Sequence, residues 1–395
     1  MNVSEIMLEL VRSIVFESGI EKKKLQGIKE SINGEMLEAL YKLSKAHDID
    51  NLVGAALQKY ALIAPNDSEI SSKLCKSKLV AAFRCDKIER ETTLILDTLE
   101  KAEFDHIPLK GAVIRKLYPE EWMRTSCDID VLVRKEDLDA AIECLKSKLG
   151  YTAEDLKSGH DISLYSKNNI HIELHFTLEE KIEKVNGVLS SVWDNVYLVE
   201  GKSHRYRLTN EFLLFHVISH AAKHFVYGGC GVRCFIDMML IKNQLQLDSI
   251  YFDDLINRSG LSSFAMVCDR LCKLWFEKAK VTDKSNKDFI YVVEEYVLCG
   301  GVYGSKSNRI KLTRKNTKKS YALSRIFMPY YLLKERYPIL VDHKYLFPIF
   351  QVVRWFSLLD GKRFKRIRKE VQINNSIKDD QVQKSHEMIL WLGLN

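Results

Sequence analysis

The segment from Arg124 to Val133 constrains the fold more than any other part of the chain, because it places two carboxylates inside an apolar strand pattern. Side chains alternate across a β-strand, so Asp128 and Asp130 emerge on one face while the intervening apolar side chains take the other. Carboxylates rarely occupy such a strand unless they are paired or bind a metal. The pattern therefore predicts a buried strand with a divalent-cation site on one face.

A second stretch, from Ile170 to Phe176, alternates strictly between apolar and polar side chains. Its polar face carries His171, Glu173 and His175. If this strand lies beside the first, Glu173 becomes the third carboxylate of one cluster, which suits two hard cations (Mg²⁺ or Mn²⁺) roughly 4 Å apart. For the two histidines three interpretations stay open: partners of the carboxylates, contacts to an acceptor, or ordinary exposed strand residues.

The third feature lies upstream, where the short apolar stretch Phe104 to Leu109 leads into Lys110 and Gly111. Residues 112–118 then have helical spacing, and Pro119 ends them. Gly111 would lie at a strand-to-helix junction, where free backbone N–H groups and the helix dipole can hold phosphate. Lys110 could add a positive charge to the same anion, although a Lys-Gly pair before a helix is common.

The order of these features resembles the polymerase-β-type nucleotidyltransferase superfamily. More narrowly it resembles a poorly characterised nucleotidyltransferase group with the segments LKG, YP, R, DIDVLV and a later HIELH-type strand. In this chain the segments are Leu109 to Gly111, Tyr118-Pro119, Arg124, Asp128 to Val133 and His171 to His175. The resemblance covers about residues 95 to 240, and a continuation to about 350 stays open.

The resemblance implies an α+β fold, with a small mixed β-sheet core flanked by N- and C-terminal helical regions. It implies transfer of a nucleoside monophosphate from an NTP, such as ATP, to an acceptor hydroxyl, with two Mg²⁺ ions and release of pyrophosphate. The implied metal-binding and catalytic residues are Asp128, Asp130 and Glu173. The implied nucleotide-binding residues are Lys110, Gly111 and Arg124.

Two alternatives remain beside this hypothesis. Ala112 follows Gly111 where the wider superfamily usually has Ser or Gly, so a non-catalytic protein that binds a nucleotide or a partner on the same scaffold stays open. For Lys110 and Arg124, surface ion pairs are an equal alternative to phosphate contacts. The residues do not distinguish a small-molecule, RNA or protein acceptor, nor one NTP or oligomeric state from another.

Length and patterning predict three regions. Residues 1–95 have helical spacing, residues 96–200 hold the motifs of the nucleotidyltransferase core, and residues 201–395 are helical again with basic runs. No apolar run is long enough to cross a membrane, and the N-terminus lacks the basic start of a signal peptide. Nine cysteines at irregular spacing give no disulfide framework, which favours the cytoplasm.

A helix capped by Thr209 is predicted to carry His216, His220 and His224 on one stripe. These histidines are interpreted as structural residues, as contacts in a substrate cleft, or as metal ligands, and the three interpretations stay open. For Arg233 and Asp237, which are one helical turn apart, the alternatives are a cleft lining and a mutual ion pair.

Two basic runs, 306–319 and 362–369, concentrate the excess charge of a chain whose formal net charge is +7. Ser, Asn and Thr interrupt the first run, which predicts a loop. Such runs can bind RNA, an anionic membrane or a large acceptor, or remain a solvated surface; nucleic acid is a possible partner but not the favoured one. The apolar and aromatic residues of 330–333 and 345–356 are predicted to complete a helical core.

Overall fold

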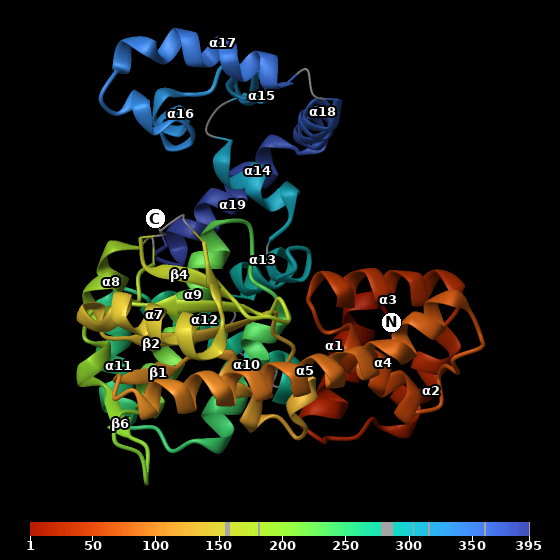
Figure 1. Ribbon diagram of the computed structural model, residues 1–395. Helices are drawn as coiled ribbons and strands as arrows, with labels where there is room; N and C mark the ends of the chain where they lie inside the picture. The colour runs from red at the N-terminus through yellow and green to blue at the C-terminus, as the bar shows by residue number, and fades with distance from the viewer. Residues whose placement is uncertain are drawn as a thin grey trace.

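The computed structural model describes residues 1–154, 159–180, 182–277, 287–302, 304–314, 317–358 and 361–394. Helices form most of the molecule and surround a small mixed sheet, so the predicted α+β class is confirmed (Figure 1). Of the predicted basic runs, Lys315 and the side chains of 362–364 lie outside the described residues.

Five strands form the main sheet. In spatial order they are β1 (His106–Pro108), β2 (Asp128–Val133), β5 (His171–His175), β4 (Asp161–Tyr165) and β3 (Thr152–Ala153). β2 and β5 are parallel, whereas the other neighbouring pairs are antiparallel. The three strands predicted from the sequence, β1, β2 and β5, are therefore confirmed and lie side by side.

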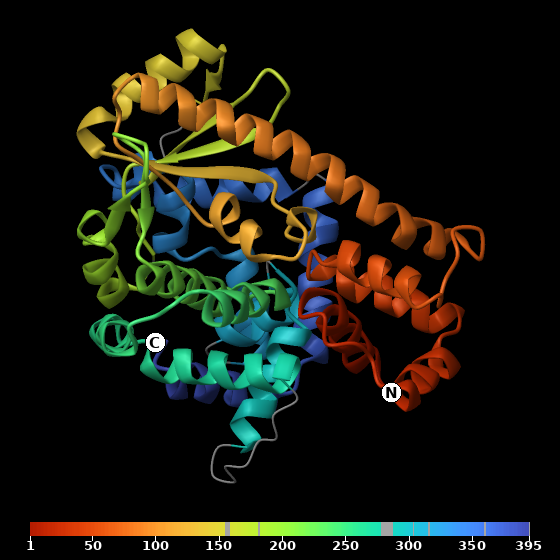
Figure 2. The ribbon, with the colours of Figure 1, turned by 90° about the horizontal axis from the view of Figure 1, so that it is seen from below.

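One face of the sheet is apolar and buried. The long helix α5 (Glu69–Lys101) and α7 (Leu138–Leu149) cover this face, and Figure 2 shows α5 running across it. Ile129, Val131 and Val133 belong to the resulting core, as the alternation in β2 predicts. Gly150 ends α7 with a positive φ of 71°, which glycine adopts without steric cost. The opposite face of the sheet is left for polar side chains.

The N-terminal helices pack beside the sheet. They are α1 (Val3–Val15), α2 (Lys22–Ser31), α3 (Gly34–Ala46) and α4 (Asp50–Lys59). Their apolar faces join the larger core cluster, which also contains residues of the helices that follow the sheet. α5 continues through residue 95 to Lys101, so one helix links the expected N-terminal region to the sheet.

A hairpin of β6 (Val196–Leu198) and β7 (Tyr206–Leu208) follows the sheet and was not expected from the sequence. The helix before this hairpin in the chain is α8 (Glu183–Leu189), and those after it are α9 (Asn210–Val226), α10 (Val232–Gln244), α11 (Ser249–Ser259), α12 (Ser262–Cys272) and α13 (Lys287–Leu298). The Thr209 hydroxyl accepts from the Phe212 N–H at 3.2 Å, so the predicted cap of α9 is confirmed.

The chain ends in a helical lobe, which we call the C-terminal lobe (residues 306–376). Its helices are α14 (Lys306–Thr313), α15 (Lys318–Ile326), α16 (Tyr330–Arg336), α17 (Phe347–Leu358) and α18 (Gly361–Ser376), and α19 (Asp379–Trp391) returns to the larger core. The loop predicted for the first basic run is wrong, because Ser305 and Thr317 cap helices there.

The core predicted for the aromatic segments of this lobe is largely wrong as well. Tyr331, Tyr345 and Phe356 are 59%, 73% and 69% exposed, respectively. All nine cysteines lie at described positions and are free thiols. Among the described residues, none of the helices has both the length and the apolar composition that crossing a membrane requires.

Candidate active site

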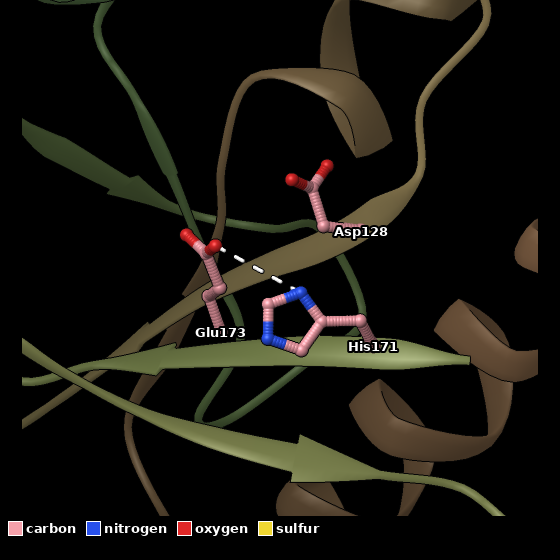
Figure 3. A group of neighbouring side chains, drawn as sticks. All are labelled: Asp128, His171 and Glu173. Atoms are coloured by element: carbon pink, nitrogen blue, oxygen red, sulfur yellow. Dashed lines mark ion pairs between the residues drawn. The ribbon is translucent and has the colours of Figure 1, made fainter. Parts of the chain in front are cut away.

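The polar face of β2 and β5 gathers the predicted acidic residues. In the parallel register Asp130 lies opposite Glu173, and Asp128 lies opposite His171. Figure 3 shows the Asp128, His171 and Glu173 side chains on the same side of the two strands. Their ligand atoms lie within 4.8 Å of one another, and so do those of Asp130, Glu173 and His175. The sheet thus forms two overlapping groups of potential metal ligands, with Glu173 in both.

The two histidines of β5 are held by different partners. His175 is 5% exposed, and its Nε2 lies 3.1 Å from Asp130 Oδ1, so it is not an ordinary exposed strand residue. His171 is half-buried, with Nε2 3.0 Å from the Ser163 hydroxyl and Nδ1 3.9 Å from Glu173 Oε1. The His175 imidazole therefore contacts the carboxylate cluster directly, and the His171 imidazole lies between Glu173 and Ser163 of β4.

Burial and charge divide the carboxylates into two kinds. Burial raises the pKa of Asp128, and the neighbouring Asp130 and Glu173 charges raise it further. Burial also tends to raise the pKa of Asp130, but Lys110 and His175 outweigh it and hold that pKa well below its usual range. Burial tends to lower the pKa of His175, whereas hydrogen bonds to Asp130 and Glu173 raise it to about 9. One carboxylate is thus compensated by cations, and the other faces repulsion that a divalent cation would relieve.

Lys110 occupies the turn after β1. The Leu109 N–H donates to the Asp130 carbonyl at 3.0 Å, which ties this turn to β2, and Lys110 Nζ lies 3.8 Å from Asp130 Oδ1. The backbone of Lys110 has φ 33° and ψ −100°, a region that residues with a Cβ rarely adopt. Such strain recurs at functional sites, where the surrounding structure holds it in place. Lys110 is therefore a half-buried partner of the acidic cluster in the cleft, and the surface-pair interpretation is wrong for it.

Gly111 begins the short helix α6 (Gly111–Ile114) and is closely surrounded. A Cβ at this position would lie 3.2 Å from Arg124 Nη1 and 3.4 Å from the Ser126 hydroxyl. Arg115, which is fully buried, donates from Nε to the Gly111 carbonyl at 2.8 Å and from Nη2 to Ser126 Oγ at 2.7 Å. The Arg115 side chain thus links the Gly111 carbonyl to the Ser126 hydroxyl and holds that hydroxyl beside Gly111.

Arg124 is buried and binds Asp237 of α10 in a two-pronged ion pair. Its Nε and Nη2 lie 3.0 and 2.9 Å from the two carboxylate oxygens, and the Tyr118 hydroxyl donates to the same carboxylate at 2.7 Å. Arg124 is thus not a surface residue. Of the two alternatives for Arg233 and Asp237, the mutual ion pair is wrong, because Arg233 pairs with Asp48 at the junction of α3 and α4. Both residues line the cavity described below, as the other alternative had it.

A cavity of about 370 Å³ joins these residues. Its lining includes all six predicted site residues: Lys110, Gly111, Arg124, Asp128, Asp130 and Glu173. Asp161 of β4 and Asp48 of the N-terminal region also line it. The sheet, the Lys110 turn and the N-terminal region therefore meet at one cleft.

Helix α9 forms the wall opposite the sheet. His220 Nδ1 lies 3.1 Å from a carboxylate oxygen of the buried Glu180, Lys223 Nζ lies 2.9 Å from the other oxygen, and His224 contacts His220 at 3.0 Å. Burial lowers the pKa of His220 well below its usual value and that of His224 to about 4. His216 lies deeper in the helix packing, outside the cavity lining. Two of the three histidines are thus neutral groups at the cleft.

The comparison with known families agrees with this geometry. A family model described as an uncharacterised nucleotidyltransferase matches residues 33–277. The chain belongs to this nucleotidyltransferase family. The match begins just before α3, well ahead of the predicted start at about 95, and ends with the π-helical turn Lys273–Glu277, between the two predicted ends at about 240 and about 350. Neither a curated protein nor a solved structure matches the chain.

The candidate site also contains residues that sequence patterns did not single out. They are Asp48, Arg115, Ser126, Asp161, Glu180 and Lys223. Ser126 lies only two residues before Asp128, which is a signal that could have been used. Arg115 lies four residues after Gly111, whereas Asp48, Asp161, Glu180 and Lys223 come from segments that no local pattern connects to the motifs.

The donor set fits hard divalent cations. Asp128, Asp130 and Glu173 present carboxylate oxygens, which Mg²⁺ and Mn²⁺ prefer, and both burial and the neighbouring negative charges raise the pKa of Asp128. Among the described residues, the groups able to hold a metal do not include His216, His220 or His224.

Proposed function

We propose that the protein is a Mg²⁺-dependent nucleotidyltransferase, which moves a nucleoside monophosphate from an NTP to an acceptor hydroxyl and releases pyrophosphate. The observation that carries the proposal is the register of β2 and β5, which sets Asp128, Asp130 and Glu173 on one wall of a cavity. Membership of the nucleotidyltransferase family supports the reaction class. ATP is one of the candidate donors.

Asp128, Asp130 and Glu173 would hold two Mg²⁺ or Mn²⁺ ions. When bound, such ions neutralise triphosphate charge and promote ionisation of an acceptor hydroxyl. Glu173 would accept the proton of that hydroxyl. The oxygen of the acceptor hydroxyl would then form a bond to the α-phosphorus while the bond from this phosphorus to the β-bridging oxygen breaks, and pyrophosphate would leave with the electron pair.

The remaining groups of the cleft would position the triphosphate. The backbone at Gly111 and the Lys110 ammonium would bind it, and Arg124 would offset charge on the leaving pyrophosphate. Ala112 lacks the hydroxyl that the wider superfamily usually carries after the glycine. We propose that Ser126 supplies it, since its Oγ is held by Arg115 beside Gly111.

The first experiment is calorimetric titration of the full chain with ATP, GTP, CTP and UTP, each with and without Mg²⁺ or Mn²⁺. Metal-dependent binding of an NTP by the native protein, lost in an Asp128→Asn/Asp130→Asn variant, would support the proposal. Pyrophosphate release is then measured with candidate acceptors. Binding without any release would favour a non-catalytic nucleotide-binding protein. Failure of a folded protein to bind any NTP would contradict nucleotidyl transfer and favour a scaffold that binds a partner instead.

We also propose the cytoplasm as the compartment. All nine cysteines are free, and thiols remain reduced there.

A further inference from the structure

The C-terminal lobe lies apart from the candidate active site and outside the residues that match the family model. In Figure 1 its helices α15 to α18 project from the rest of the molecule, and α17 is the outermost of them. α16 and α18 pack against α17. The lobe therefore has a surface of its own, whose purpose the transfer chemistry does not explain.

Helix α17 has its polar side chains inside and its apolar side chains outside. Gln351 and Arg354 are only 6% and 3% exposed, and they bond to backbone groups of Met328 and Arg325. The solvent side of the helix is apolar. We call this surface the α17 face: Ile349, Val352, Val353, Trp355 and Phe356, with exposures from 36% to 69%. A helix that only completed a core would present the opposite pattern.

Neighbouring elements extend the α17 face. The Phe327 ring at the end of α15 contacts Trp355 with centroids 5.3 Å apart, and Phe327 is itself 54% exposed. Further exposed apolar side chains of the lobe are Leu323, Tyr331, Ile339, Val341 and Tyr345. An exposed apolar surface of this kind marks a binding site for a protein or a membrane.

The positive charge of the C-terminal lobe indicates an anionic partner. The lobe contains eighteen Lys and Arg against four Asp and Glu, whereas the whole chain has a net charge of only +7, so the rest of the chain is acidic overall. Its exposed cations include Lys344 after α16 and, on α18, Lys365, Arg366, Arg368 and Lys369. The charge of the protein is thus separated, with the positive pole on the lobe that bears the α17 face.

We propose that the C-terminal lobe docks on an anionic lipid bilayer, with the α17 face inserted at the level of the headgroups and the cations of α18 against lipid phosphates and carboxylates. Exposed Ile and Val beside Trp, Tyr and a cluster of Lys and Arg are the composition of helices that lie in a membrane interface. Single-stranded nucleic acid would instead favour aromatic platforms for base stacking over aliphatic side chains. With twelve residues, α17 is too short to span a bilayer and would lie along its surface.

The test is flotation of the full-length protein with two kinds of vesicle, phosphatidylcholine alone and phosphatidylcholine mixed with phosphatidylserine. We expect flotation with the mixed vesicles only, and less of it as salt is raised, because salt screens the attraction. No flotation of the folded protein with either kind, or equal flotation with both, would overturn the proposal.

Two variants, each with a matched control, test whether the α17 face and the α18 cations form the vesicle-binding surface. Ile349→Asn/Val352→Asn/Phe356→Asn should lower vesicle binding at least about tenfold, whereas Tyr197→Asn/Leu198→Asn/Ile250→Asn, which are also exposed but lie outside the lobe, should not. Reversal of four cations on α18 (Lys365, Arg366, Arg368 and Lys369, each to Glu) should also lower it at least about tenfold. Reversal of four exposed lysines in the N-terminal region (Lys22, Lys23, Lys29 and Lys59) is the control. Circular dichroism checks that each variant is folded.

Two results would assign the surface elsewhere and overturn the proposal. Self-association that the apolar variant abolishes, without vesicle binding by the native protein, would make the α17 face a contact between copies of this chain. RNA binding that the α18 variant abolishes, again without vesicle binding, would assign the cations to nucleic acid. Neither result touches the proposed transfer reaction, because all four variants lie outside the cavity lining.

Discussion

Asp130 and Glu173 lie directly opposite each other on parallel strands, although they come from motifs far apart in the sequence. The Lys110 ammonium and His175 imidazole both contact Asp130, so this carboxylate is held ionised. Asp128 on the same strand is less compensated, and its pKa is raised by burial and by its acidic neighbours. A site in which one carboxylate is held ionised and another is repelled by its acidic neighbours is suited to bind divalent cations.

Glu173→Gln should separate binding from chemistry. We expect metal-dependent NTP affinity to fall less than about tenfold, because Asp128 and Asp130 remain, while nucleotidyl transfer falls at least about a thousandfold. Calorimetry and pyrophosphate release measure the two effects. Glu136→Gln, an exposed acid ahead of α7, serves as the control and should change neither quantity. Full transfer activity in the Glu173 variant would refute its proposed role.

Gly111→Ala should weaken NTP binding about tenfold or more. The added Cβ would lie 3.2 Å from Arg124 Nη1 and 3.4 Å from Ser126 Oγ, where the proposed phosphate site narrows. Gly27→Ala in α2 meets no neighbouring atom within 4 Å, and it should leave binding intact while stabilising the helix by about 0.5–1 kcal/mol. Calorimetric titration and thermal unfolding of both variants check these expectations, and an unchanged affinity for Gly111→Ala would count against a phosphate at this turn.

Asp237→Asn should destabilise the fold by about 3 kcal/mol, because it leaves the buried Arg124 guanidinium without its counter-charge. Asp254→Asn removes a carboxylate from an exposed pair with Arg258 in α11 and should cost less than about 1 kcal/mol. Urea unfolding of the two variants measures the difference in the free energy of unfolding. Equal losses would mean that the Arg124–Asp237 pair behaves like a surface pair.

His106 should make the stability depend on pH. Burial lowers its pKa to about 4, and its Nδ1 contacts the Phe104 carbonyl while Arg205 donates to Nε2, so the neutral ring is the bound form. Because the folded pKa is below the ordinary value near 6.5, this stability is present above pH 6.5 and is lost as pH falls toward 4, by up to about 3 kcal/mol.

The check on His106 is urea unfolding between pH 7 and pH 4. His106→Gln should be less stable than the native protein at pH 7 and should lose less stability on acidification. His343→Gln, at an exposed position of the C-terminal lobe, should follow the native profile. A His106 variant with the native slope would show that other groups control the acid transition.

Local patterns in the sequence predicted much of the site. The alternation of polar and apolar residues in β2 and β5 requires only the twofold period of a strand, and it was enough to predict that Asp128, Asp130 and Glu173 share a face. The Thr209 cap and the Gly150 stop depend equally on a few neighbouring residues. Such signals survive in the sequence because backbone geometry links residues two to four positions apart.

Partners and surfaces were decided by the tertiary structure. Sequence proximity suggested that Arg233 pairs with Asp237. Because α10 packs against the turn before β2, Asp237 pairs with Arg124 instead, and Arg233 pairs with Asp48. The apolar residues of α17 have core composition, but the lobe buries Gln351 and Arg354 instead. The sequence by itself thus determined which residues share a strand face or begin and end a helix. Only the tertiary structure decided which charges meet and which apolar face remains exposed, because these depend on contacts between segments that no local period relates.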